Sequence, residues 1–293
     1  MKVGLITNSL AWAGMKDLKE ISNWACDNGF KDLEVGPTIE LDEKIFSDIK
    51  EEGKIDISAL IYCRNFLDEE NNIGDEHKKQ LIRRIEFAGK LGIEKVICST
   101  GVTKDAYYGA RFNPEKSVEA VTEWLKELAE YAERNNVKIA IENCPMMGNI
   151  AISPYMWDIL FDKVDSDKIG LAFDPSHMIW QFMSPYENII KYRSKIFHFH
   201  GKDTEILYDN LKKVGILHNI TEETNFFEHQ WWRHRLVGLG DIDWNKIVAN
   251  LYEIDYEGTI SIEHEDPVWE GTLDKVEKGL IRAKNHIERF IEG

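Results

Sequence analysis

Four side chains that can bind a metal ion end four successive apolar runs in the second half of the chain. The runs are IAIE, LAFD, IFHFH and ISIE, and the residues that end them are Glu142, Asp174, His200 and Glu263. If the runs are parallel strands of one barrel, their last residues lie together at one rim. Three carboxylates and one imidazole form a ligand set for a hard or borderline divalent cation.

The alternation of side chains indicates that both glutamates face the inside of such a barrel. Glu142 shares a face of its strand with Ala140, and Glu263 shares one with Ser261, whereas the larger isoleucines point the other way. A buried carboxylate is costly unless a positive charge compensates it, and a divalent cation would do so. Oxygen ligands with one imidazole favour Mn²⁺, with Mg²⁺, Co²⁺ and Zn²⁺ as alternatives.

Further polar residues follow the same strand ends. We expect His177 to contact a ligand, with bracing of its turn as the alternative. Lys202 is a candidate substrate contact, although a surface ion pair with Asp203 would also explain it. His198 alternates onto the face of His200 one layer deeper, which predicts a hydrogen-bonded core residue. The other histidines are assigned structural roles: His218, His229, His234, His264 and His286.

The elements that must position these residues alternate regularly along the chain. Helical spacing of apolar residues occurs at 17–28, 76–91, 115–134 and 272–291. Short apolar runs predict eight strands at 2–7, 32–36, 56–62, 95–100, 138–143, 169–174, 196–200 and 259–263. This alternation allows a closed barrel or an open doubly wound sheet, and no glycine-rich nucleotide-binding motif supports the second. We therefore predict an α/β chain with one (β/α)8 TIM barrel as a single domain over 1–293.

Two connections in the predicted barrel are unusual. About forty residues, from 201 to 241, separate the seventh strand from its helix, and such a long connection usually has a function or structure of its own. It is rich in aromatic and basic residues, including Arg235, a candidate substrate contact. The apolar stretch 144–153 is the second. Either could cover a ligand or form a subunit interface. Trp12, just after the first strand, could stack on a sugar ring or belong to the core.

The amino-acid composition restricts the classes of partner that the protein can bind. The 36 basic and 52 acidic residues leave a net charge of −16, which disfavours binding to nucleic acid or to an anionic membrane. The N-terminal sequence MKVGLITNSL reads as a strand rather than as a secretion signal, and no run is long enough to span a bilayer. Four widely spaced cysteines favour structural thiols in a cytoplasmic protein. A homo-oligomer is expected, and the resemblance of the strand ends to a known family implies a small-molecule carbohydrate substrate.

The strand ends taken together resemble the xylose isomerase-like TIM-barrel family of sugar isomerases and epimerases. The matching stretches are IENCP at 141–145, FDPSHMIWQ at 173–181, HFHGKDT at 198–204, GLGDIDW at 238–244 and SIEHED at 261–266. The resemblance implies four metal ligands, Glu142, Asp174, His200 and Glu263. It also implies that Glu142 and Glu263 are the catalytic acid–base pair and that His177 contacts a substrate oxygen.

One position departs from the ketose 3-epimerases of that family, which carry an arginine six residues after the histidine ligand. Here that residue is Ile206, and Lys202, Arg233 or Arg235 could supply the charge instead. The expected activity is metal-dependent isomerisation or epimerisation of a sugar, keto-sugar or inositol derivative through an enediolate. The alternatives are a lyase such as an inosose dehydratase or an oxidised-glycoside lyase, and a non-catalytic sugar-binding or assembly subunit. The acidic charge and the single histidine ligand argue against the related endonuclease IV-type repair enzymes.

Overall fold

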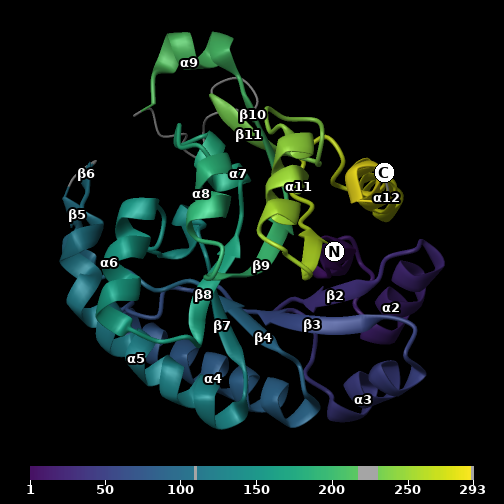
Figure 1. The fold of residues 1–293 in the computed structure, drawn as a ribbon, viewed down its shortest axis with the longest axis horizontal. Helices are drawn as coiled ribbons and strands as arrows, with labels where there is room; N and C mark the ends of the chain where they lie inside the picture. The colour runs from purple at the N-terminus through teal and green to yellow at the C-terminus, as the bar shows by residue number, and fades with distance from the viewer. Residues whose placement is uncertain (109–110, 217–229, 292–293) are drawn as a thin grey trace.

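Eight parallel strands close a barrel, and helices surround it (Figure 1). The computed structural model describes residues 1–108, 111–216 and 230–291. Around the barrel the strands follow the order β1, β12, β9, β8, β7, β4, β3, β2. Each barrel strand therefore pairs with the barrel strands that precede and follow it in the chain, and β12 pairs with β1 to close the barrel. The predicted (β/α)8 barrel is confirmed. Within the described residues, no helix is long and apolar enough to cross a membrane.

The barrel strands coincide closely with the eight predicted runs. They are β1 (Lys2–Ile6), β2 (Asp32–Val35), β3 (Asp56–Ile61), β4 (Lys95–Cys98), β7 (Lys138–Glu142), β8 (Ile169–Phe173), β9 (Ile196–Gly201) and β12 (Thr259–Ile262). The α-helices outside them are α1 (Asn8–Trp12), α2 (Leu18–Asp27), α3 (Glu43–Glu52), α4 (Ile73–Leu91), α5 (Val118–Asn135), α6 (Pro154–Val164), α7 (Ser176–Ile179), α8 (Tyr186–Lys191), α11 (Trp244–Glu253) and α12 (Leu273–Ile291).

Short elements decorate the loops. They are the 3₁₀ turns η1 (Glu70–Asn72), η2 (Lys104–Ala106), η3 (Pro114–Ser117) and η4 (Pro145–Met147), and the two-residue strands β5 (Tyr107–Tyr108) and β6 (Arg111–Phe112). Helix starts follow local chemistry: the side chains of Asp17, Asp42, Ser153 and Asp243 accept hydrogen bonds from first-turn amides. Asp243, at the end of the GLGDID segment, caps α11 in this way.

The core has an outer and an inner layer. The outer layer lies between strands and helices and holds most of the large apolar side chains. The smaller inner layer groups Ile6, Ala59, Ile61, Cys63, Ile97, Ala140 and Ala172 inside the barrel. Ala140 in this layer confirms the predicted inward face of β7. Met147, from the apolar stretch 144–153, packs against the same inner layer, so this stretch contributes to the floor of the site rather than projecting from the surface.

The long connection after β9 contains a β-hairpin and a helix. Strand β10 (Asp203–Ile206) pairs antiparallel with β11 (Trp232–Arg235), and helix α9 (Tyr208–Val214) follows β10. Phe226, Phe227, His218 and His229, which the sequence places in this connection, lie outside the described residues. The hairpin and α9 project beyond the end of the barrel at which α7, α8 and α11 lie (Figure 1).

Asp203 attaches this hairpin to the barrel. Its buried carboxylate accepts hydrogen bonds from the amides of Thr204, Gly238 and Ile242, and from Trp244 Nε1 at 2.9 Å. Gly240 passes so close that an added Cβ would lie 2.3 Å from Asp203 Oδ1. The packing therefore depends on a carboxylate at position 203 and on a residue without a side chain at position 240.

We expect Asp203→Ala to destabilise the protein because several buried donors lose their acceptor. At roughly 1–3 kcal/mol for each buried group left unsatisfied, the free energy of unfolding should fall by at least about 3 kcal/mol. Urea unfolding followed by circular dichroism measures it. Asp209→Ala on the exposed face of α9 is the control and should change stability by less than about 0.5 kcal/mol. Equal stability of the two variants would contradict this role.

Candidate metal centre

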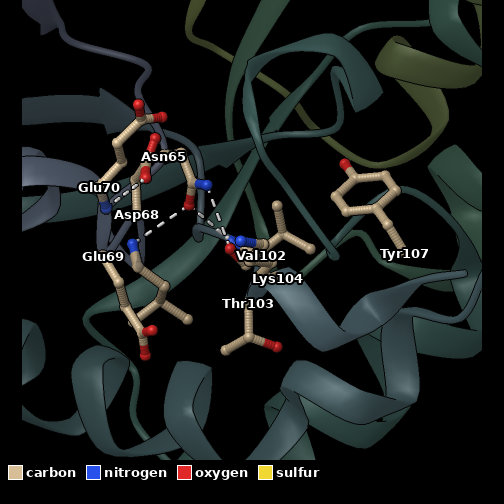
Figure 2. Close-up of a pocket in the computed structure, with 9 residues that line it drawn as sticks. Asn65, Asp68, Glu69, Glu70, Val102, Thr103, Lys104 and Tyr107 are labelled. Carbon is tan, nitrogen blue, oxygen red and sulfur yellow. Dashed lines mark hydrogen bonds between the residues drawn. The ribbon is translucent and has the colours of Figure 1, made fainter.

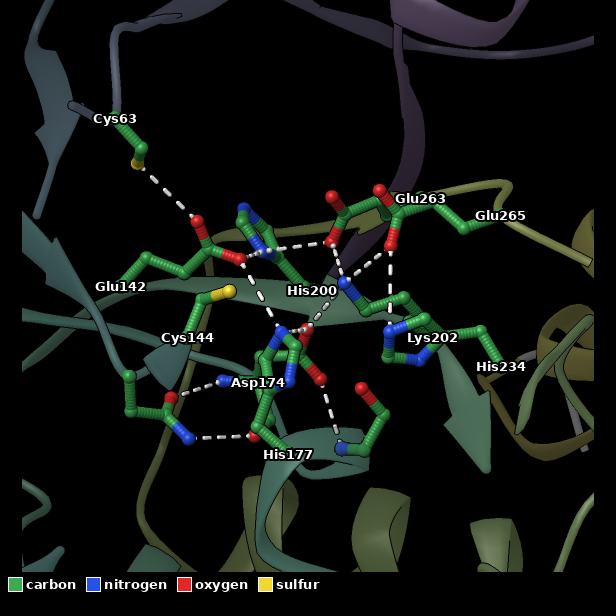
Figure 3. A network of polar contacts seen from close by, with 12 residues as sticks. Cys63, Glu142, Cys144, Asp174, His177, His200, Lys202, His234, Glu263 and Glu265 are labelled. Carbon is green, nitrogen blue, oxygen red and sulfur yellow. Dashed lines mark hydrogen bonds and ion pairs between the residues drawn. The ribbon is translucent and has the colours of Figure 1, made fainter. Parts of the chain in front are cut away.

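The four predicted ligands converge at the carboxyl ends of their strands. One ligand atom from each of Glu142, Asp174, His200 and Glu263 lies within 4.8 Å of the others. All four are buried, with exposed fractions of 4%, 0%, 0% and 9%. They come from β7, the residue after β8, β9, and the residue after β12, which are neighbouring parts of the barrel (Figure 3). The structure therefore brings together every residue of the predicted ligand set.

The donor atoms of this cluster fit a divalent cation. His200 Nδ1 lies 3.5 Å from Glu142 Oε1 and 3.4 Å from Glu263 Oε2. Within the described chain, His200 Nδ1 is buried and makes no hydrogen bond, whereas Asp174 Oδ2 and Glu263 Oε2 form ion pairs with the Lys202 ammonium. Buried carboxylates and a buried imidazole nitrogen this close together are costly, and a divalent cation would bind all three atoms at once. His200 as a ligand together with carboxylate oxygens suits a hard or borderline ion without selecting one.

Lys202 supplies positive charge at the same place. Its buried ammonium lies 2.7 Å from Glu263 Oε2, 3.1 Å from Asp174 Oδ2 and 3.0 Å from Glu265 Oε2. Burial opposes the charged form, but these carboxylates raise the pKa of Lys202 well above its usual value. The alternative of a surface ion pair with Asp203 is wrong, because both side chains are buried and Asp203 bonds to the hairpin.

The two predicted catalytic glutamates differ in their surroundings. Burial raises the pKa of Glu263. Burial acts the same way on Glu142, but the neighbouring rings of His177 and His200 hold its pKa well below the usual value. Cys63 Sγ also donates to Glu142 Oε2 at 3.2 Å. Before any cation binds, Glu142 is therefore the stronger acid of the two.

His177 joins the cluster from α7. Its Nε2 lies 3.4 Å from Asp174 Oδ2 and 3.8 Å from Glu142 Oε1, and its Nδ1 accepts from Trp180 Nε1 at 3.4 Å. Burial lowers the pKa of His177, but Cys144 and Asp174 overcome this and raise it to about 10. The indole contact leaves Nε2 facing the carboxylates, where a substrate oxygen would reach it.

Glu34 is a residue of this site that the sequence analysis does not identify. It lies on β2, fully buried, with Oε2 2.8 Å from His198 Nε2 and 3.3 Å from His200 Nε2. A carboxylate on the far nitrogen of a metal-binding histidine fixes the ring and its tautomer. Glu34 therefore turns His200 Nδ1 toward the cluster. His198 is the hydrogen-bonded core residue that its position predicts.

Arg235 and Trp12 lie elsewhere. The Arg235 guanidinium, at the end of β11, pairs with Glu205 at 2.5 Å and with Asp266 at 2.9 Å, which ties the hairpin to the loop after β12. Trp12 is 62% exposed, so a core role is wrong. It borders a cavity of about 310 Å³ with Glu270 and Gly271. Substrate contacts for both residues stay predictions.

A larger hollow lies at the same rim, between the loops that follow β3 and β4 (Figure 2). Its volume is about 560 Å³, and it contains none of the predicted site residues. Asn65 closes one side, accepting from the Leu67 and Val102 amides and donating to the Val102 carbonyl. Its remaining walls combine three acidic side chains at 68–70 with Lys104 and with apolar and neutral residues, so it lacks the convergent buried groups of the cluster around His200.

Known proteins resemble this chain in sequence and in fold. Residues 23–287 match the family described as Xylose isomerase-like TIM barrel. The chain belongs to this family. An uncharacterised protein of Bacillus subtilis, YfiH, is 29% identical over 91% of this chain and 93% of its own length. An inosose dehydratase of Clostridium beijerinckii is 27% identical over 82% and 79%.

Solved structures confirm the fold. The IOLI protein with a bound zinc atom superposes with a TM-score of 0.72 at 20% identity, covering 99% of both chains. D-psicose 3-epimerase from Clostridium cellulolyticum H10 gives a TM-score of 0.72 at 16% identity, again over 99% of both. The curated relatives thus include inosose dehydratases, while the structures of similar fold include an epimerase and a protein that holds zinc.

We expect removal of a predicted ligand to abolish tight binding of a divalent ion. Asp174→Asn keeps the shape but removes a charge, so Mn²⁺ and Zn²⁺ affinity should fall by at least about tenfold, since even groups that only orient ligands change it by 10–100-fold. Competition with a chelating dye measures the affinity. Asp158→Asn on the outer helix α6 is the control and should bind like the wild type. Equal affinity in both variants would exclude this cluster as the metal site.

Glu34 should make the folded protein sensitive to acid. Burial opposes ionisation, but His200 and His198 lower the pKa of Glu34 to about 2. An exposed glutamate titrates near 4.3, so the stabilisation is complete above about pH 5 and is lost as the pH falls toward about 2. We expect the Tm to drop over this window in calorimetry. Glu34→Gln should flatten the drop, whereas exposed Glu40→Gln should reproduce the wild-type curve; an unaltered slope in Glu34→Gln would disprove the assignment.

Proposed function

We propose that this chain is a divalent-metal-dependent isomerase or epimerase that acts on a polyhydroxylated ketone, either a keto-sugar or an inositol derivative. One observation carries the proposal: Glu142 and Glu263 reach His200 Nδ1 from strands that β8 and β9 separate. Two carboxylates on either side of one binding position can remove and return a proton on different faces or carbons of a substrate. The family membership of the chain supports this reading.

The predicted roles follow from the contacts in the site. A bound divalent cation would polarise the substrate carbonyl and acidify the neighbouring C–H. In this proposal Glu142 takes that proton, with the His177 and His200 rings beside its carboxylate. Glu263 is placed to return a proton from the other side. His177 Nε2 is free to hold a substrate hydroxyl, and Mn²⁺ remains our expected ion.

Dehydration is the second candidate, and Lys202 favours it. Loss of a β-hydroxyl from the same enediolate requires that this oxygen leave as water, which needs a proton. The Lys202 ammonium beside Glu263 places a protonated group next to one of the proton-transferring carboxylates. Several curated relatives are inosose dehydratases. Both candidates share proton removal next to a carbonyl and differ in the fate of the enediolate.

We expect the protein with Mn²⁺ to exchange a carbon-bound hydrogen of a keto-sugar or an inosose for solvent deuterium. Mass spectrometry detects the exchange, and the products decide between the candidates: an isomer keeps the substrate formula, whereas a dehydratase product lacks one water. Glu142→Gln and Glu263→Gln should each slow exchange by at least about 100-fold, the usual scale of acid–base catalysis.

Glu70→Gln, an exposed glutamate at the rim, is the matched control and should exchange at the wild-type rate. Metal binding by all three variants must be measured in the same preparations, because Glu142 and Glu263 are also predicted ligands. Exchange that persists at full rate in both site variants would disprove the proposed acid–base pair.

A further inference from the structure

The hairpin β10–β11 places a histidine over the candidate metal centre. His234 pairs with Thr204 in the hairpin register, and its ring lies 5.3 Å from the His177 ring at 88°. His234 Nε2 is 3.6 Å from Glu265 Oε2, too long for a hydrogen bond. Figure 3 shows the ring beside Lys202 and Glu265, on the opposite side of the cluster from Glu142. The sequence predicts a structural role for His234, and its position beside the cluster is the reason to consider a binding role.

Both ring nitrogens of His234 are buried without a hydrogen-bond partner in the described part of the chain. Burial and the nearby Lys202 ammonium lower the pKa of His234 to about 3, so the ring is neutral. A neutral imidazole has one donor and one acceptor nitrogen. Leaving both unused in a buried position is costly, and one or two substrate hydroxyls could satisfy them.

Aromatic stacking holds His234 in place. Trp232, two residues before it on β11, stacks on Trp180 from the loop after α7, with ring centres 4.6 Å apart and planes within 3°. The His234 ring packs against Trp232 at 4.9 Å. A parallel stack of Phe182 on Trp231 joins the same two segments. These contacts form a firm wall beside the cluster, so the His234 ring is fixed before any ligand arrives.

The cations on this side of the site are already paired. Lys202 contacts three carboxylates, while Arg233 and Arg235 both pair with Glu205, and Arg235 also binds Asp266. Ile206 on β10 is buried and apolar. Among the described residues, a phosphate on the substrate would meet carboxylates here and no unpaired positive charge. This wall therefore suits hydroxyl groups rather than an anion.

We infer that His234 is a substrate-binding residue that recognises hydroxyl groups of an uncharged polyhydroxylated ketone, and that the hairpin selects such substrates over phosphorylated ones. The inference rests on the proposed function for the identity of the reacting end of the substrate. In this arrangement the carbonyl end of the substrate lies at the cluster around His200, and a hydroxyl further along the substrate lies against His234.

The test compares His234→Ala and His234→Asn with His286→Ala, a control on the outer helix α12 that leaves the site intact. The probes are an inosose, D-fructose and D-fructose 6-phosphate. We measure Mn²⁺ affinity, the quenching of tryptophan fluorescence by each probe, and KM and kcat for deuterium exchange. For the inosose or for D-fructose, His234→Ala should raise Kd and KM by about tenfold or more, with unchanged Mn²⁺ affinity and a smaller change in kcat.

Asparagine also offers one donor and one acceptor, so His234→Asn should recover part of the affinity, and the control should match the wild type. The wild type should bind D-fructose at least as tightly as its phosphate ester. Unchanged Kd in His234→Ala, tighter binding of the phosphate ester, or no binding of any probe would overturn the inference. Binding that depends on His234 without any exchange would support it while the proposed function fails, so the two failures are distinguishable.

Discussion

Neutralising buried negative charge inside the barrel is the constraint on which this structure depends. Glu34, Glu142, Asp174 and Glu263 are buried around one short segment of the barrel axis. Carboxylates this close repel one another strongly in a medium of low polarity, and each has also lost its water. Only well-placed partners make such a cluster compatible with a stable fold. The surrounding polar residues are arranged to provide that compensation.

A short stretch of chain at the end of β9 provides much of this charge compensation. His200 points into the cluster, and Gly201 packs against β12 so closely that an added Cβ would lie 2.8 Å from Ile262. Lys202 then turns inward with its ammonium, while the Asp203 carboxylate binds the amides of Gly238 and Ile242 in the segment between β11 and α11. The charge balance of the site and the attachment of the hairpin are therefore coupled through consecutive residues. A substitution that alters the charge balance of the site should therefore also alter the attachment of the hairpin, and the reverse.

The sequence predicts the barrel well because its signals are local. Near-continuous apolar runs identify the eight strands, and alternation in IAIE and ISIE correctly turns Glu142 and Glu263 inward. Strand ends in the second half then give the cluster, since strand ends of a closed barrel share one rim. The same reasoning does not find Glu34, although it also lies near a strand end. In DLEV it lies one residue before the end, and only its contact with His200, far away in sequence, reveals its role.

The structure of the long connection after β9 cannot be predicted from local sequence signals. Its aromatic and basic composition predicts either a ligand cover or a subunit interface, but no periodicity indicates a hairpin. The antiparallel register of β10 and β11 decides which residues face the site, and it points Arg235 to Asp266 and His234 to the cluster.

The barrel is common to proteins of this fold, whereas the groups on its rim differ among them. Structures with 15–20% identity keep the barrel, because its closure requires only apolar strands of suitable length and pairing. Such likeness cannot fix a substrate, since function resides in the groups placed on the rim. In this chain the rim groups divide between the strand ends, which supply carboxylates and an imidazole, and the hairpin, which supplies His234 and its indole support. In the function that we propose, proton chemistry depends on the first set, which can be retained while the second set changes with the substrate.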